Sequence, residues 1–271
     1  MHTILESPAL PTVAELVASD YRKANVFNQF GIDFCCGGKK SIADVCAEKG
    51  IELGELETAL ALSSAQTSMG IHWDFQQWDT VFLMDFIVQA HHGYVRAQLP
   101  RLMRFGEKVV RSHGEKWPET IEIFRRVKAL NDELTPHMEK EEHILFPYIK
   151  KMVAAAKGEG LMPRPPFGTV QNPVRVMESE HETAGELMHE IRDLSNDYTP
   201  PAGACNTFRA WYGLLKEFEE DLHLHVHLEN NILFPRAVEM EKAQLSYPAC
   251  LVPRFCKIAV QHTRSAIFQN R

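Results

Sequence analysis

The stretches HMEKEEHILFP at residues 137–147 and HVHLENNILFP at residues 225–235 share one frame, H-x-x-x-E-x-x-I-L-F-P. Residues four apart on an α-helix lie on one face about one turn apart, so each histidine can reach a common point with its glutamate. A single H-x-x-x-E arises by chance in many helices and is typical of a solvated face. The direction in which each pair faces therefore decides whether the pair forms a site.

Helical phase places both His-Glu pairs on the apolar faces of their helices. The stripe that contains His225 and Glu229 also contains Trp211, Leu215, Phe218, Leu222 and Leu233. The stripe that contains His137 and Glu141 also contains Val127, Leu130, Leu134 and Leu145. Both pairs are expected to point into a core, whereas three other histidines are expected to face solvent: His143, His223 and His227.

Two further histidines also lie on apolar stripes. His92 shares its stripe with Val81, Val88, Leu99 and Met103, and His181 shares its stripe with Val174, Met177 and Met188. His92 precedes His137 by 45 residues, and His181 precedes His225 by 44. The chain therefore repeats His, then His-x-x-x-Glu, twice. Asp85 on the His92 stripe is a candidate partner for a ligand histidine, and Glu180 beside His181 is a candidate for lining access to the site.

The chemistry of these six residues indicates a metal centre. Buried glutamates need a compensating charge, which a metal ion supplies. Imidazole and carboxylate ligands suit iron or manganese, and six are too many for one tetrahedral zinc. Two metals fit better, with two histidines on each, both glutamates bridging, and an open position for a diatomic molecule. The alternative is a bundle core in which the His-Glu pairs only hydrogen-bond to each other.

Composition limits the class of protein. The 271 residues are 45% hydrophobic and 24% charged, which is ordinary for a folded globular chain. The net charge is -7 and residues 1–240 contain no basic block, so nucleic acid is not an expected partner. No apolar stretch is long enough for a membrane span, and MHTILESPAL lacks the features of a secretory signal. We therefore expect a cytoplasmic protein without a membrane partner.

The order of helical patterns predicts an all-α protein with two parts. Short patterns occupy residues 12–62, with helix starts expected at Ser19 and Ser41 and helix ends at Gly31 and Gly50. Longer patterns are expected at 78–105, 119–152, 173–196 and 206–241, with a Gly- and Pro-rich loop at 155–172. The predicted domains are a small helical domain at 1–65, a four-helix bundle at 72–241, and an unassigned basic tail at 242–271.

Cys35 and Cys36 are the second candidate site. Gly37 and Gly38 follow them, and this permissive backbone lets both thiols face one opening. Lys39 and Lys40 come next, and nearby positive charge favours the reactive thiolate. The pair is a candidate for redox or iron-transfer chemistry; the alternative is two small apolar residues at a turn. The other four cysteines are expected to be packing residues: Cys46, Cys205, Cys250 and Cys256.

Several motifs resemble a known family. FGIDFCCGGKKSIADVC at 30–46, QLP at 98–100, VMESEHETAGEL at 176–187 and the two repeated stretches are similar to hemerythrin-like di-iron bundles, and more specifically to the bacterial family named for repair of iron centres. The resemblance departs in the longer loop at 155–172 and the tail from about 242. It implies iron ligands at the same six positions: His92, His137, Glu141, His181, His225 and Glu229.

The resemblance also implies a function. Its members are implicated in restoring iron-sulfur clusters damaged by nitric oxide or peroxide, and they hold two iron ions per chain in an oxo- and carboxylate-bridged centre. The implied partners are damaged iron-sulfur proteins, nitric oxide or oxygen, and a second copy of the chain in a homodimer. The mechanism stays open between donating iron and removing nitric oxide, and only reduction of nitric oxide would make the protein an enzyme. The competing function is a module that senses or stores oxygen or nitric oxide.

Overall fold

The structure is a computed structural model that describes residues 10–65 and 74–246. Within these residues every regular element is helical, apart from one isolated β-bridge between Thr12 and Ser41. The predicted all-α class is confirmed. The N-terminal part contains four helices: α1 (Val13–Ser19), α2 (Lys23–Gln29), α3 (Ile42–Lys49) and α4 (Leu53–Ala65).

Local capping explains where the N-terminal helices begin and end. Ser41 caps α3 by accepting from the backbone N–H of Asp44, and Gly50 ends that helix in a left-handed conformation, as predicted. The predicted helix start at Ser19 is wrong. Thr12 caps α1 instead, in a reciprocal capping box with Glu15, so Ser19 is the last residue of that helix.

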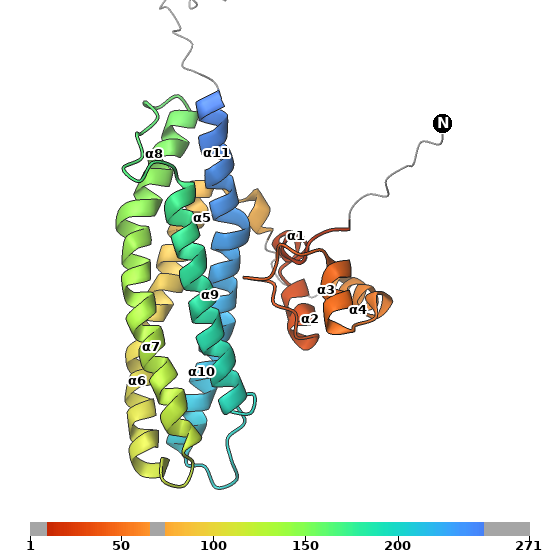
Figure 1. The fold of residues 1–271 in the computed structure, drawn as a ribbon, viewed down its shortest axis with the longest axis vertical. Coiled ribbons are helices and arrows are strands. Elements are labelled where there is room, and N and C mark those ends of the chain that lie inside the picture. The colour runs from red at the N-terminus through yellow and green to blue at the C-terminus, as the bar shows by residue number, and fades with distance from the viewer. Residues whose placement is uncertain (1–9, 66–73, 247–271) are drawn as a thin grey trace, which may run out of the picture.

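A short 3-10 turn, η1 (Phe75–Gln77), leads into four long helical rods that lie side by side (Figure 1). The first rod is α5 (Thr80–Phe86), η2 (Ile87–His92) and α6 (Gly93–His113), and the second is α7 (Glu119–Lys140), η3 (Glu141–Leu145) and α8 (Phe146–Ala156). The third rod is α9 (Gln171–Leu194), and the fourth is α10 (Asn206–Leu228), η4 (Glu229–Leu233) and α11 (Phe234–Ser246). The predicted bundle is confirmed, and its first rod extends beyond the expected end at residue 105.

Three π-helical turns interrupt the rods next to candidate ligands. His92 is the last residue of η2, Glu141 is the first of η3 and Glu229 is the first of η4. A π-turn inserts an extra residue into the helical repeat and changes the direction of the side chains that follow, and such turns are frequent at functional sites. The local backbone therefore departs from regular α-helix at these three positions.

The core joins the N-terminal helices to the bundle. One apolar cluster contains Val13, Phe27 and Phe34 from the N-terminal part together with Trp211 and Phe218 from α10. A second cluster lies between α5, α8, α9 and α11 and includes Leu145 and Leu233. Figure 1 shows the N-terminal helices packed to one side of the rods, with the segment between α2 and α3 reaching toward them.

The close packing around Gly106 on α6 leaves no room for a side chain. A Cβ atom at this position would lie 2.5 Å from Phe124 Cδ2 and 2.9 Å from Trp211 Cζ2. We expect Gly106→Ala to lower the free energy of unfolding by about 1–3 kcal/mol, because the side chains of α7 and α10 must shift. Gly213→Ala on α10 is the matched control, since its Cβ would meet nothing within 4 Å. Thermal unfolding of both variants checks this, and equal midpoints would contradict close packing at Gly106.

Candidate metal centre

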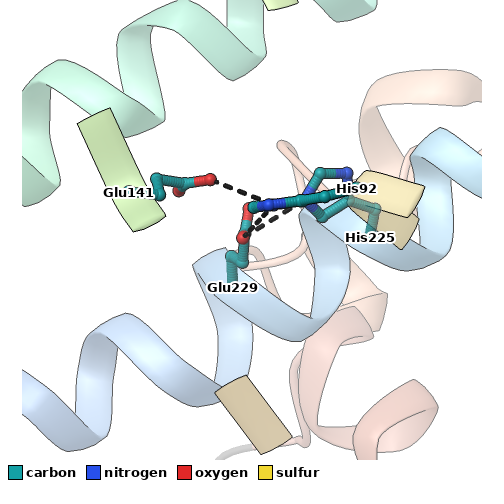
Figure 2. A group of neighbouring side chains, drawn as sticks. All are labelled: His92, Glu141, His225 and Glu229. Carbon is teal, nitrogen blue, oxygen red and sulfur yellow. Dashed lines mark hydrogen bonds and ion pairs between the residues drawn. The ribbon is translucent and has the colours of Figure 1, made fainter. Parts of the chain in front are cut away.

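The structure brings all six predicted ligands together as two groups that share both glutamates. His92 and His225 form one group with Glu141 and Glu229, shown in Figure 2, and the ligand atoms lie within 4.8 Å of one another. A second group pairs the remaining two histidines with the same glutamates: His137, His181, Glu141 and Glu229. Each group therefore combines one histidine from each half of the repeat.

The six candidate ligands are buried and their side-chain atoms converge. All six side chains are at most 1% exposed. The Nε2 atoms of His92 and His225 are 3.1 Å apart, and those of His137 and His181 are 3.0 Å apart. Glu229 reaches both groups, since Oε1 lies 3.2 Å from His225 Nε2 and Oε2 lies 3.1 Å from His181 Nε2. Glu141 Oε2 lies 3.3 Å from His92 Nε2 and 3.4 Å from His137 Nε2.

The buried carboxylates of the centre are suited to binding a cation. The four oxygens of Glu141 and Glu229 are buried and make no hydrogen bond, although histidine Nε2 atoms lie 3.1–3.4 Å from three of them. Burial opposes the charged forms of His92 and His137, but the two carboxylates outweigh it and raise the pKa of each histidine to about 10. Ion pairs with the histidines alone leave these buried oxygens without hydrogen bonds, which is costly. The donor set and these buried oxygens fit iron.

Three of the four histidines are held from behind through Nδ1. His92 Nδ1 lies 2.6 Å from Glu142 Oε1, and His137 Nδ1 lies 2.8 Å from Glu180 Oε2. His181 Nδ1 lies 2.8 Å from Asn230 Oδ1. Such partners fix the ring orientation and leave Nε2 free to bind a metal.

Sequence reasoning missed Glu142 and Asn230. The available signal was the repeat itself, because each of them directly follows a central glutamate. The prediction that Asp85 supports a ligand histidine is wrong, since its side chain is exposed and pairs with Lys150 at 2.6 Å. Glu180 pairs with His137 and Lys140, which both lie on α7. Its contact in the structure is therefore with a candidate ligand histidine, and its predicted role in lining access to the site stays a prediction.

The surface assignments of the other histidines were right only in part. His143 is exposed, as predicted. His227 is fully buried and His223 is half-buried, so the solvent-facing prediction for these two is wrong. The ring of Phe34 contacts both, at centroid distances of 5.9 Å for His223 and 5.7 Å for His227. This burial lowers the pKa of His227 to about 4.

The loop that carries Cys35 and Cys36 docks on the bundle. The two Sγ atoms are 3.9 Å apart, and Asp33 Oδ1 accepts from the Cys35 thiol at 3.0 Å. Asn231 Nδ2 donates to the carbonyl oxygens of Phe34 at 3.2 Å and Cys35 at 3.1 Å. Asp33, Cys35 and Cys36 thereby form a second small group of potential metal ligands.

The expected activation of the cysteine pair by lysines is wrong for Cys35. Lys39 pairs with Glu178 and Lys40 pairs with Glu48. The pKa of the Cys35 thiol is raised well above its usual value by its hydrogen bond with Cys36, by burial and by the charge of Asp33.

The remaining cysteines divide into three cases. Cys46 is buried, in agreement with its predicted packing role. Cys205 is exposed, with Sγ 3.1 Å from His113 Nε2, so the packing prediction is wrong there. Cys250 and Cys256 lie outside the described residues.

A bundle with paired buried His2Glu2 groups defines a cation-binding helical protein. The hemerythrin HHE cation binding domain matches residues 84–237, more than half of the chain, and the chain belongs to this family. Membership implies iron binding. A domain of unknown function matches residues 10–63, so the two matches lie within the two predicted domains.

Named relatives cover most of the chain. An iron-sulfur cluster repair protein YtfE from Dickeya chrysanthemi (strain Ech1591) is 39% identical over 230 residues, covering 85% of this chain and 97% of the relative. The protein of the same name from Yersinia pestis (strain Pestoides F) is 40% identical over 221 residues, covering 81% of this chain and 93% of the relative. That from Yersinia pseudotuberculosis serotype O:1b (strain IP 31758) is 39% identical with the same coverage.

Among the described residues, no helix is both long and apolar enough to cross a membrane. Cytoplasmic location, the homodimer and the absence of nucleic-acid binding stay predictions.

Proposed function

We propose that this chain repairs iron-sulfur clusters of other proteins after damage by nitric oxide or oxidation, using a di-iron centre held by the six buried ligands. The observation that carries the proposal is the pair of His2Glu2 groups, whose four buried carboxylate oxygens make no hydrogen bond. Its relatives are named as iron-sulfur cluster repair proteins, and they share the length of the chain and not only the bundle.

The centre suits iron as cargo. His92 and His225 would hold one iron ion and His137 and His181 the other, and Glu141 and Glu229 would contribute to both positions. The irons supply an exchangeable metal and an open position for a diatomic ligand. The protein's own part is to exclude water from the site and to present four imidazole nitrogens and two carboxylates in a fixed arrangement.

The cysteine loop is the candidate acceptor of the iron. Asn231, two residues after Glu229, holds the backbone of Cys35, so one short stretch contributes both to the centre and to the docking of the loop. Thiols bind iron as thiolates, and the metal itself displaces their protons. Cys35 and Cys36, with Asp33, are therefore the proposed acceptor of iron on its way to a damaged cluster.

Removal of nitric oxide is the second candidate. Each metal position has four protein ligands, two histidines and two glutamates, which leaves coordination open for a small molecule. In this alternative the centre takes nitric oxide from the cluster, and the iron stays in the bundle.

Incubation of the chain loaded with labelled iron and a nitric-oxide-damaged iron-sulfur enzyme separates these functions. Recovery of enzyme activity with label transfer supports iron donation. Recovery without label supports removal of nitric oxide. No recovery contradicts repair and favours the alternative of a module that senses or stores oxygen or nitric oxide.

The double variant Cys35→Ser, Cys36→Ser tests the acceptor. We expect an unchanged iron content but repair slower by about 10-fold or more, the loss typical when groups that bind or hold a metal are removed. Serine preserves the size and the hydrogen bond of Cys35 with Asp33. Cys205→Ser, an exposed cysteine on the bundle, is the control and should repair at the normal rate. Unchanged repair in the double variant would contradict the acceptor role.

A further inference from the structure

The partners behind the ligand histidines follow the twofold repeat of the chain. Glu142 directly follows Glu141 and accepts from His92, and Asn230 directly follows Glu229 and accepts from His181. In each half, the residue after the central glutamate therefore holds the first histidine of that half.

A second acceptor, from the residue directly before the first histidine of a half, is present in only one half. Glu180, the residue before His181, accepts from His137. The corresponding residue before His92 is His91, which faces His225. The His91 ring stacks on the His225 ring with a centroid distance of 5.6 Å and an interplanar angle of 9°. His91 Nδ1 pairs with Asp221 Oδ1 at 2.9 Å, and the buried Nδ1 of His225 has no hydrogen-bond partner.

Stacking does not replace the missing acceptor. A parallel ring limits the tilt of His225, but it offers no lone pair to the Nδ1–H in the ring plane. A hydrogen-bond acceptor behind a ligand histidine raises its basicity as well as fixing its orientation, and losing one such partner typically costs about 10- to 100-fold in metal affinity. The His92–His225 pair has one histidine so held, and the His137–His181 pair has two.

We infer that the two metal positions are unequal, and that the iron held by His92 and His225 leaves first while the iron held by His137 and His181 is retained. The inference rests on the proposed di-iron centre and deepens it, because the first of these ions is then the one donated during repair. The inequality arises because His91 occupies the position at which the other half of the repeat has the acceptor Glu180.

Chelation of the iron-loaded full-length chain under anaerobic conditions tests this inference without any measurement of repair. A ferrous chelator should remove one iron about 10- to 100-fold faster than the other. Crystals of the half-depleted chain, examined by anomalous scattering at the iron edge, should show iron between His137 and His181 only. Loss of both ions at one rate, or residual iron between His92 and His225, would overturn the inference.

Two variants should each narrow the difference between the two release rates, one by slowing the fast phase and the other by accelerating the slow phase. His91→Gln offers an amide oxygen to His225 and an amide N–H to Asp221, so it should slow the fast phase toward the slow one. Glu180→Ala removes the acceptor from His137 and should accelerate the slow phase. Glu178→Ala is the matched control, because Glu178 lies on the same helix and pairs with Lys39 away from the centre. Rates that stay unchanged in both test variants would also overturn the inference.

These results separate the inference from the proposed function. Two equally labile irons with intact repair would refute the inequality and leave repair standing. Unequal irons without repair would refute the function and leave the inequality standing. A chain that binds fewer than two irons refutes the di-iron centre and the inference together.

Discussion

Replacing Glu229 with glutamine is expected to reduce the iron content of the chain from the proposed two ions to fewer than one. Glu229 approaches His92, His181 and His225, so it belongs to both metal positions. The amide keeps the shape of the side chain but removes the negative charge and leaves one oxygen in place of two. One metal position therefore loses its Glu229 oxygen, and the negative charge that Glu141 and Glu229 together supply to both positions is halved.

Iron analysis after anaerobic reconstitution measures this effect. Glu217→Gln on the same helix is the matched control, because Glu217 is exposed and belongs to neither ligand group. Thermal unfolding of the metal-free variant shows whether the fold survives. A folded variant that still binds two irons would contradict the bridging assignment.

Raising the pH is expected to tighten iron binding steeply. His92 and His137 have a pKa of about 10 in the metal-free chain, so both carry protons at neutral pH and must lose them to bind metal. Release of two protons predicts that the apparent affinity of the whole centre rises about 100-fold per pH unit below that pKa. Competition with a chelator of known affinity at several pH values measures this slope.

The stability of the metal-free chain should fall as the pH rises, whereas its affinity for iron should increase. Because the pKa of His92 and His137 is raised on folding, their contribution to stability is full below the ordinary histidine value of 6.5 and is lost as the pH rises toward about 10. Raising the pH through this window should therefore lower the unfolding midpoint of the metal-free chain while strengthening iron binding. Iron affinity that does not change with pH would contradict protonated histidines as the balancing charges.

Helical periodicity was sufficient to predict the bundle and to predict that the six candidate ligands lie in its interior. It succeeded because burial of an apolar stripe constrains every side chain on that stripe, including the polar ones. The same reasoning failed for His227 and His223. These two histidines lie on a face of the helix that points away from the bundle core, and the loop around Phe34 covers that face. A contact between segments far apart in the sequence cannot be predicted from local periodicity.

The hydrogen-bond partners of the ligand histidines also could not be predicted from helical periodicity. Asp85 has the correct helical phase to approach His92, yet it lies at the surface, whereas Glu142 on a different rod makes the contact. Sequence spacing relates residues on one helix, while these hydrogen bonds cross between helices. The π-turns add to the difference, because they alter the direction of side chains at the positions that matter for the centre.

The amino-acid sequence was enough to predict the all-α class, the twofold repeat and the inward direction of the six candidate ligands, because hydrophobic periodicity and the cost of burying a charge act on each helix separately. The pairing of His92 with His225 and of His137 with His181 became visible only in the folded chain. The same is true of the missing partner at His225 Nδ1 and of the docking of the cysteine loop through Asn231. The physical reason is that these contacts depend on how the rods pack against one another and against the N-terminal helices, which local periodicity does not specify.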